Sequence, residues 1–218
     1  MKYEYVSRNE YQPIRNELEE IIKKVQNICR ELNKEFTFQF KLVGSGSRHL
    51  ITRVENGNTG YDFDYNLILN NHDQNSHWKP SYAKRLIMDA FQKVLKGTNY
   101  NNPQDSTSAI TIKVVDRKNK RIIHSCDFAI VYNVEDADAE YYKYIRFNKA
   151  QNNYTWETRK CSENIDRKLN WLKEYVNGYW ELIKKEYLKV KNANNDKNKH
   201  SFQLYYESIC NVYNWYKD

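Results

Sequence analysis

The sequence predicts an α+β fold in which a mixed β-sheet is flanked by helices and followed by a mainly helical C-terminal domain. Two patterns support this prediction. Polar and apolar residues alternate over 36–43 and 61–69, as in strands that bury one face. Apolar residues recur every three or four positions over 14–32 and 82–95, as in helices that bury one side. With 218 residues, 40% of them hydrophobic, the chain can bury a substantial core.

In the first part of the chain, helices and strands are expected to alternate before a hairpin. The expected order is a helix over 14–32, a strand over 36–43, a turn over 44–47, a short helix over 48–53, a strand over 61–69, a helix over 82–95 and hairpin strands over 109–115 and 121–132. Asn56-Gly57-Asn58-Thr59-Gly60 ends the short helix, because glycine and asparagine favour turns. In the strand that follows, Asp62, Asp64 and Asn66 share one face, and the aromatic and aliphatic residues share the other.

The character of the sequence changes after Val134. The segments expected beyond it are, in order, an acidic then aromatic stretch over 136–144, a hairpin over 146–159 that turns at Asn152-Asn153, and helices over 162–191 and 200–216. We therefore predict an α/β domain at residues 1–134. A mainly helical domain with a linking hairpin is predicted at residues 135–218.

Charge and cysteine content narrow the class of protein. The formal net charge of +7 is a small excess for this length, and it suits an ordinary soluble surface as well as a polyanionic partner. The four cysteines lack metal-site spacing, so we expect reduced thiols in a cytoplasmic protein. The N-terminus has no apolar signal region and no apolar run is long enough to span a membrane, so no membrane partner is expected. His72, Asp73 and His77 favour a solvated turn over a zinc site.

One turn and three carboxylates support the functional prediction. The turn Gly44-Ser45-Gly46-Ser47 can offer backbone N–H groups to phosphate oxygens. It is not a Walker A loop, because no Gly-Lys-Ser/Thr follows, and it is not a dinucleotide fingerprint, because His49 occupies the third glycine position. Asp62, Asp64 and Asp127 lie in apolar segments, where charge is costly unless it is paired or bound to metal. Together they predict hard oxygen ligands for Mg²⁺.

These residues resemble the motif of the DNA polymerase β-type nucleotidyltransferase superfamily. Its members include poly(A) polymerases, CCA-adding enzymes, oligoadenylate synthase-like and cyclic-dinucleotide synthase-like proteins, and antibiotic nucleotidyltransferases. The superfamily motif is a Gly-Ser turn, a short helix, an acidic-x-acidic strand and a later acid, which correspond here to Gly44, Ser45, Asp62, Asp64 and Asp127. The match covers roughly residues 36–132. The link over 54–61 is longer than the commonest spacing, which leaves open whether Ser45 or Ser47 contacts phosphate.

The resemblance implies an enzyme with a palm domain that transfers a nucleoside monophosphate from an NTP to a hydroxyl and releases pyrophosphate. It also implies two Mg²⁺ ions, with Mn²⁺ as the alternative, held by Asp62 and Asp64 and, for one ion, by Asp127. The nucleotide-binding residues expected with it are Gly44, Ser45, Gly46, Ser47, Lys168 and Ser201. Arg48, just past the turn, is either a further nucleotide-binding residue that neutralises phosphate charge or an ordinary surface arginine.

The acceptor stays open at this point. RNA, a second nucleotide, a protein and an aminoglycoside all offer hydroxyl groups, and neither base preference nor oligomeric state follows from the sequence. The expected partners are an NTP substrate and an RNA or nucleotide acceptor. Two alternatives remain: a nucleic-acid- or protein-binding module that keeps the fold without catalysis, and a toxin or defence nucleotidyltransferase that modifies tRNA or protein.

Overall fold

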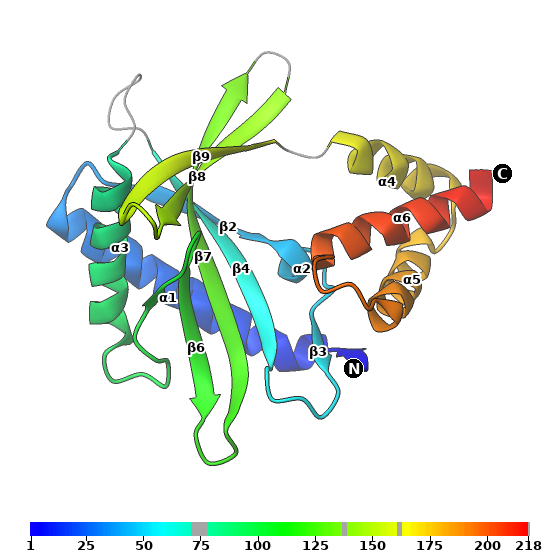
Figure 1. Ribbon diagram of the computed structural model, residues 1–218, viewed down its shortest axis with the longest axis horizontal. Helices are drawn as coiled ribbons and strands as arrows, with labels where there is room; N and C mark the ends of the chain where they lie inside the picture. Colours follow the sequence, from blue (N-terminus) through cyan, green and yellow to red (C-terminus); the bar gives the residue numbers. More distant parts are fainter. Residues whose placement is uncertain (71–77, 137–138, 161–162, 218) are drawn as a thin grey trace. The chain divides into compact units, whose positions relative to one another are not determined.

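The computed structural model describes residues 1–70, 78–136, 139–160 and 163–217 (Figure 1). Its helices are α1 (Arg8–Leu32), α2 (Gly44–Ser47), α3 (Pro80–Leu95), α4 (Glu163–Tyr175), α5 (Tyr179–Ala193) and α6 (Ser201–Lys217). Its strands are β1 (Tyr3–Tyr5), β2 (Phe38–Val43), β3 (Thr52–Val54), β4 (Tyr61–Leu69), β5 (Gln104–Asp105), β6 (Ile110–Asp116), β7 (Arg121–Asp136), β8 (Ala139–Asn148) and β9 (Asn153–Lys160). His72, Asp73, His77 and Cys161 lie outside the described residues.

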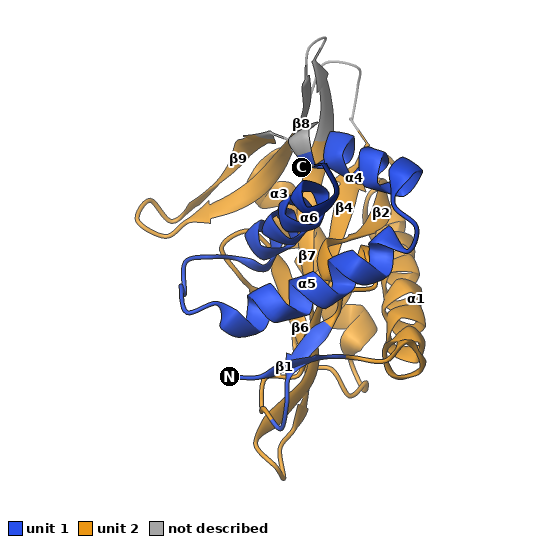
Figure 2. Cartoon of the chain, turned by 90° about the vertical axis from the view of Figure 1, so that its right-hand side faces the viewer, with its two compact units in different colours: residues 1–5, 52–56, 162–218 blue, residues 6–51, 57–161 orange. Residues whose placement is uncertain are grey.

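Contacts divide the chain into two compact units (Figure 2). The helical unit comprises Met1–Tyr5, Thr52–Asn56 and Ser162–Asp218, and the sheet unit comprises Val6–Ile51 and Gly57–Cys161. The hairpin of β8 and β9 therefore belongs with the sheet, while two short N-terminal segments belong with the C-terminal helices. This division differs from a single boundary after residue 134, because strand pairing joins segments that are distant in sequence.

The sheet unit is built on a mixed sheet. Its strands follow the order β2-β4-β7-β6-β5, and β8 extends it by pairing with β7 and β9. The strands β4 and β7 are parallel, and the other pairs in this sheet are antiparallel. The parallel pair at the centre is the step that brings the acidic motif of β4 beside β7.

One face of the sheet is covered by α1 and α3, and we call it the core face. The residues that pack there are apolar and fully buried, among them Leu18, Ile22 and Val25 of α1, Ile87 and Phe91 of α3, Phe63, Tyr65 and Leu67 of β4, and Phe128 of β7. The ring centroids of Phe91 and Phe128 are 4.6 Å apart. Helix α1 starts at an N-cap, because the Ser7 hydroxyl accepts a hydrogen bond from the Glu10 N–H at 3.3 Å.

The opposite face carries polar side chains, and we call it the polar face. Directly paired residues of neighbouring strands share a face. Register and alternation therefore place on it Lys41 of β2, Asp62, Asp64 and Asn66 of β4, Thr111 and Lys113 of β6, and Ser125 and Asp127 of β7. The predicted split of β4 into two faces is confirmed, since Phe63, Tyr65 and Leu67 are buried, whereas the acidic residues of the other face are not.

Two helix predictions are wrong. The helix expected over 48–53 is absent: the helical turn is α2 itself, His49 takes a left-handed backbone (φ 56°), and β3 then pairs with β1. The single helix expected over 162–191 is two helices, α4 and α5, which are separated at Gly178 with φ +68°. Gly178 is the N-cap residue of α5, and glycine adopts this left-handed conformation at low cost.

The helical unit packs α4, α5 and α6 against one another and against the two-stranded sheet of β1 and β3. Its core consists mainly of buried apolar residues, including Leu172, Val176, Ile183, Leu204, Ile209 and Val212. The N-terminal strand is tied to α5, because the Tyr5 hydroxyl donates to the Lys184 carbonyl at 2.7 Å and the Tyr3 N–H donates to Asn192 Oδ1 at 2.6 Å.

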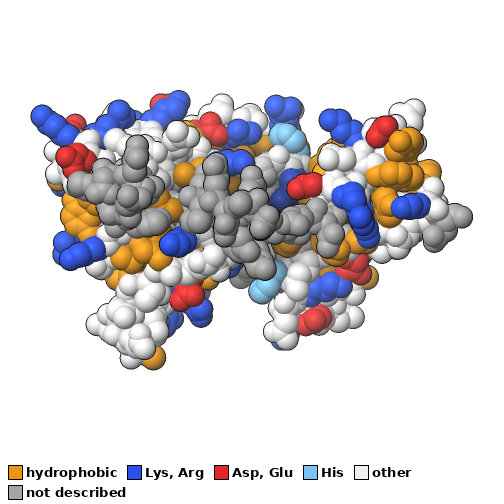
Figure 3. All heavy atoms as spheres, turned by 90° about the horizontal axis from the view of Figure 1, so that it is seen from above, with side chains coloured by type: hydrophobic (Ala, Val, Ile, Leu, Met, Phe, Trp, Pro, Cys, Tyr) orange, Lys and Arg blue, Asp and Glu red, His pale blue; other side chains and the backbone are white. Residues whose placement is uncertain are grey.

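The surface has mixed charge, as the small net charge of the sequence indicates. On the face seen in Figure 3, the described Lys and Arg side chains are scattered among acidic and neutral ones. Within the described residues, no helix has the length and apolar character needed to cross a membrane. The described cysteines, Cys29, Cys126 and Cys210, are free thiols.

Candidate active site

The parallel pairing of β4 with β7 brings the three carboxylates together. The register places Asp64 directly opposite Asp127 and Asp62 directly opposite Ser125. Asp62 and Asp127 are exposed and Asp64 is half-buried. The flanking apolar residues suggested a core strand, but the acids themselves do not lie in the apolar core. They lie on the polar face, and their apolar neighbours Phe63 and Cys126 are buried beneath them.

Hydroxyl groups on neighbouring strands hold the two outer carboxylates. The Ser125 hydroxyl donates to Asp62 Oδ1, and the Thr111 hydroxyl donates to Asp127 Oδ1 at 2.5 Å. The Ser106 and Thr111 hydroxyl oxygens are 2.7 Å apart. Because the single proton of Thr111 points at Asp127, Ser106 must donate to Thr111. A relay of two hydroxyls therefore orients Asp127.

The carboxylates repel one another. Burial first, and then the charges of Asp127 and Asp62, together raise the pKa of Asp64 to about 6. Partial burial also raises the pKa of Asp127, as does the charge of Asp62, while the Thr111 hydrogen bond and the charges of Lys113 and Lys84 oppose this rise. The site thus holds more negative charge than its surroundings balance, and a bound cation would relieve that repulsion.

The turn at α2 lies against this site through Gly44. Gly44 has φ +64°, and a Cβ added to it would lie 2.5 Å from Asp64 Oδ2. Only glycine allows the turn to approach the carboxylate this closely in this conformation. The side chains of Ser47 and Arg48 both donate to the Gly44 carbonyl, at 3.0 and 2.9 Å, and so brace the turn from its own side.

The other two turn residues have backbone roles. The Ser45 carbonyl accepts hydrogen bonds from the N–H groups of Arg48 and Leu50, at 3.3 and 2.9 Å, which closes the helical turn. Gly46 is buried, and a Cβ there would approach Leu42 Cδ1 to 3.1 Å. The first N–H groups of a helix have no partner inside it, so the turn can present them to an anion.

The donor set suits a hard divalent cation, although the side chains do not yet converge on one. Within the described residues, no three side chains among His, Cys, Asp and Glu are arranged to hold a metal ion. Asp62 and Asp127 are each engaged by a hydroxyl through one oxygen, so the second oxygen of each stays outside these two hydrogen bonds. Carboxylate oxygens are the ligands that Mg²⁺ prefers, and the raised pKa of Asp64 marks where a cation would be stabilised.

Two of the predicted nucleotide-binding residues lie away from the turn in the sequence. These are Lys168 and Ser201, and both belong to the helical unit. The Lys168 ammonium donates to Cys210 Sγ at 3.1 Å and lies 5.3 Å from the centre of the Tyr213 ring. The Ser201 hydroxyl accepts from the Lys191 ammonium at 3.3 Å. Their contact with a nucleotide stays a prediction.

Sequence reasoning missed the cations and hydroxyls that surround the carboxylates. Lys84 is only 3% exposed, pairs with Asp105 at 2.9 Å and donates to the Ala109 carbonyl at 2.8 Å. Burial lowers the pKa of Lys84, and the charges of Asp105 and Asp127 oppose that shift. The sequence offered one signal for Lys84, because it lies among the apolar residues of the helix predicted over 82–95. Thr111 and Ser125 gave no local signal, because their partners lie on other strands.

Comparison with known proteins rests on structure alone. No family model and no curated protein matches the chain. Vibrio cholerae DncV cyclic AMP-GMP synthase in complex with nonhydrolyzable GTP is similar, with a TM-score of 0.61 at 11% identity over 95% of this chain and 68% of that one. Escherichia coli MS115-1 CdnC with ATP is also similar, with a TM-score of 0.51 at 10% identity over 95% of this chain and 62% of that one. The chain therefore shares the fold of DncV and CdnC.

The fold shared with DncV confirms the predicted α+β class, and it agrees with the resemblance found in the sequence. The chain spans about two thirds of DncV and CdnC, and 43% of the Bradyrhizobium diazoefficiens CD-NTase CdnG. The similarity to DncV is a similarity of fold.

Proposed function

We propose that this chain is a Mg²⁺-dependent nucleotidyltransferase that transfers a nucleoside monophosphate from an NTP to a hydroxyl of a nucleotide or RNA, with release of pyrophosphate. One observation supports it above all others: Asp64 lies opposite Asp127, with Asp62 on the same face and the Gly44 turn against Asp64. This arrangement combines metal-binding oxygen donors with a phosphate-binding turn.

Each residue has a distinct role in the proposed reaction. Asp62 and Asp64 would hold two divalent ions, and Asp127 would complete the ligand set of one of them. Bound metal supplies charge neutralisation at the phosphoryl oxygens and lowers the pKa of the attacking hydroxyl. The turn would hold the β- and γ-phosphates through its backbone N–H groups, which keeps the leaving group in line. Thr111 and Ser106 would keep Asp127 oriented and ionised.

The bound molecules named for the similar structures support the NTP substrate. DncV is described with nonhydrolyzable GTP, and in a further structure with a TM-score of 0.60 it is described with the linear intermediate 5′ pppA(3′,5′)pG. CdnC is described with ATP. A nucleotide with a free hydroxyl is therefore an acceptor of the right chemistry for this fold.

The direct test is transfer of label from each of the four α-labelled NTPs. The purified chain would be incubated with Mg²⁺ and, separately, with mononucleotides, short oligoribonucleotides and total RNA. Asp64→Asn should abolish labelling, whereas Asp116→Asn, a change at a half-buried position of the β6–β7 turn, should leave it intact. Absence of labelled product with Mg²⁺ and with Mn²⁺, or full activity of Asp64→Asn, would overturn the proposal.

Metal dependence separates the enzyme from a binding module that merely keeps the fold. The NTP dissociation constant would be measured with and without Mg²⁺. An enzyme of the proposed kind should bind the NTP more tightly with Mg²⁺, because the repelling carboxylates then face metal-bound phosphate. Equal affinity in the two conditions would favour the non-catalytic alternative.

A further inference from the structure

A second group of side chains lies on the polar face, farther along β7 than the carboxylates. The register pairs Val131 of β7 with Tyr144 of β8, and Val131 shares a face with Asp127 because the two are four positions apart. Tyr144 therefore projects from the same face as the carboxylates. At the usual strand rise, the separation along β7 is roughly 13 Å.

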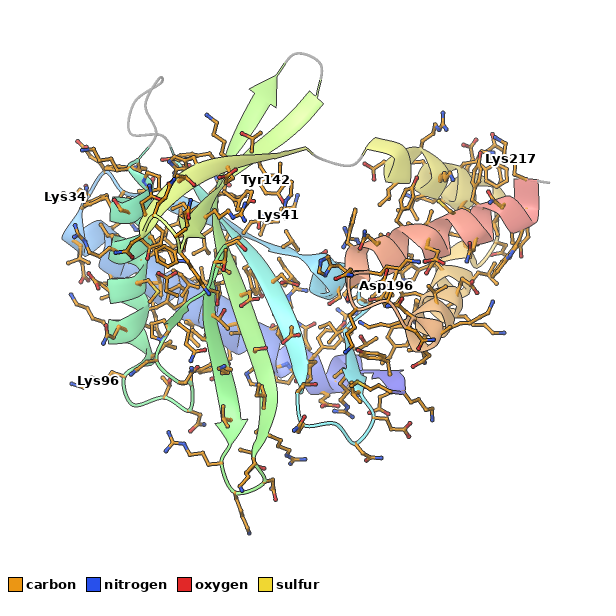
Figure 4. The ribbon with its side chains drawn as sticks, viewed as in Figure 1. Lys34, Lys41, Lys96, Tyr142, Asp196 and Lys217 are labelled. Carbon is orange, nitrogen blue, oxygen red and sulfur yellow. The ribbon has the colours of Figure 1, made fainter. Side chains whose placement is uncertain are left out.

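Three side chains form this group, which we call the Tyr–Arg cluster: Tyr142, Tyr144 and Arg159. The guanidinium carbon of Arg159 lies 4.9 Å from the centre of the Tyr144 ring and 6.0 Å from that of Tyr142. Arg159 Nη1 also donates to the Tyr142 hydroxyl at 3.3 Å. Arg159 is exposed and both tyrosines are half-buried, and Tyr142 is labelled in Figure 4.

The cluster is not the side of the hairpin that packs on the core. That role belongs to the alternate residues: Ile145 is buried, and Trp156 packs on Tyr132 with ring centroids 4.8 Å apart. The Trp156 indole N–H also donates to the Trp78 carbonyl at 3.0 Å. Burial of the opposite side of the hairpin thus accounts for Ile145 and Trp156 but not for two tyrosines stacked with an exposed arginine.

The charge of the hairpin suits an anionic ligand. Residues 142–159 contain four cations, Lys143, Arg146, Lys149 and Arg159, and one acid, Glu157. Lys143 lies on the other face of the hairpin, and Glu157 is paired with Tyr144 on the cluster's face. Arg146 shares the cluster's face, because it is two residues from Tyr144 on the same strand. Its side chain is exposed. On β2, Lys41 is exposed on the polar face and is paired with Asn66.

We infer that the Tyr–Arg cluster binds a base of an oligonucleotide acceptor, at least one nucleotide away from the hydroxyl that reacts. This inference rests on the proposed function and specifies its acceptor. Aromatic rings and guanidinium planes stack on any base, and basic side chains pair with the phosphates between bases. The distance of roughly 13 Å from Asp127 is several times the 3.4 Å spacing of stacked nucleotides, so the base bound here is not that of the reacting nucleotide.

Binding of short RNA tests the inference without requiring transfer. The dissociation constants of a fluorescent mononucleotide and of a mixed-sequence tetranucleotide would be measured by anisotropy at fixed salt. Tyr144→Ala should weaken tetranucleotide binding by about 5- to 150-fold, the range found for loss of one stacked base. Tyr144→Phe should bind like the wild type, because it keeps the ring, and Arg159→Ala should weaken binding without removing either ring.

The matched control is Thr158→Ala. Thr158 is exposed and adjacent to Arg159, but it is paired with Lys143 on the other face of the hairpin. It should leave tetranucleotide binding unchanged. Unchanged binding by both Tyr144→Ala and Arg159→Ala would overturn the inference, as would an equal loss of mononucleotide binding, since the cluster would then not lie beyond the first nucleotide.

The result is distinguishable from failure of the proposed function. Tetranucleotide binding that depends on Tyr144, in a chain that transfers no nucleotide, would support the binding site while overturning the enzyme. Transfer to a tetranucleotide that proceeds equally well in Tyr144→Ala and Arg159→Ala would support the enzyme and overturn the site.

Discussion

Replacing Asp64 with asparagine should stabilise the fold while abolishing transfer. The Asp64 carboxyl has a pKa of about 6 in the folded chain, against an ordinary value of about 3.9 in an unfolded one. Each pKa unit corresponds to 1.36 kcal/mol, so ionised Asp64 costs the folded state ~3 kcal/mol at most. Asp64 is half-buried, and solvent screens part of this repulsion, which makes about 1–2 kcal/mol the working value.

The pH dependence has a definite sign. Between about pH 4 and pH 6 the folded chain holds the Asp64 proton more tightly than the unfolded chain does, so stability falls as pH rises through this window. The cost is then fully present at pH 7.5. Asp64→Asn carries no charge to titrate, so its advantage over the wild type should be largest at pH 7.5 and should shrink toward pH 4.

Urea unfolding in the presence of a chelator, at pH 4.5 and at pH 7.5, measures this directly. Asp116→Asn provides a control of opposite sign, because hydrogen bonds from Asn119 and then the charge of Arg121 lower the pKa of Asp116. Added Mg²⁺ should stabilise the wild type more than Asp64→Asn, since a ligand stabilises only the state that binds it. A variant less stable than the wild type at pH 7.5 without divalent cations would refute the electrostatic reasoning.

Three further substitutions probe the site. Asp127→Ala should lower kcat by at least 100-fold while changing the Mg–NTP dissociation constant by less than about tenfold, and isothermal titration showing complete loss of NTP affinity would contradict this division of roles. Gly44→Ala should weaken NTP binding more than Ser45→Ala, because a Cβ at Gly44 meets Asp64 Oδ2. Ser45→Ala removes only one hydrogen bond to a charged group, which costs about 1.5–3 kcal/mol. NTP dissociation constants in the reverse order would count against a phosphate-binding turn. Thr111→Val should raise the pKa of Asp127 and shift the acid limb of the pH–rate profile upward, with Thr111→Ser restoring it, and an unshifted profile would exclude the hydroxyl relay.

Much of the sheet could be predicted from local pattern. The strand over 61–69 has the predicted limits, because aromatic and aliphatic residues at every second position, with Asp62, Asp64 and Asn66 between them, are typical of a strand that buries one face. The same alternation placed Asp62 and Asp64 on one face. The helix predicted over 48–53 was wrong because contacts with other segments determine this region. Leu50 and Ile51 are buried, and β3 is paired with β1.

The partners of the carboxylates could not be predicted in this way. Pairing of Asp64 with Asp127 depends on the parallel alignment of β4 with β7, which joins residues 63 positions apart. Thr111 is a sharper case: counting back one-for-one from the pair Asp116–Arg121 would place it opposite Cys126, on the core face. An irregularity between Val114 and Val115 shifts the register by one residue, so that Thr111 lies opposite Asp127 instead.

The sequence by itself determined which side chains are acidic, which strand face they share and where the glycine turn precedes them. Only the tertiary structure decided which strands are neighbours, and therefore which hydroxyl and which lysine lie beside each carboxylate. The physical reason is that periodicity reports burial of one face within a segment, whereas register between segments is set by packing of the whole sheet on α1 and α3. A shift of one residue moves a side chain from the polar face to the core face without any change in local sequence.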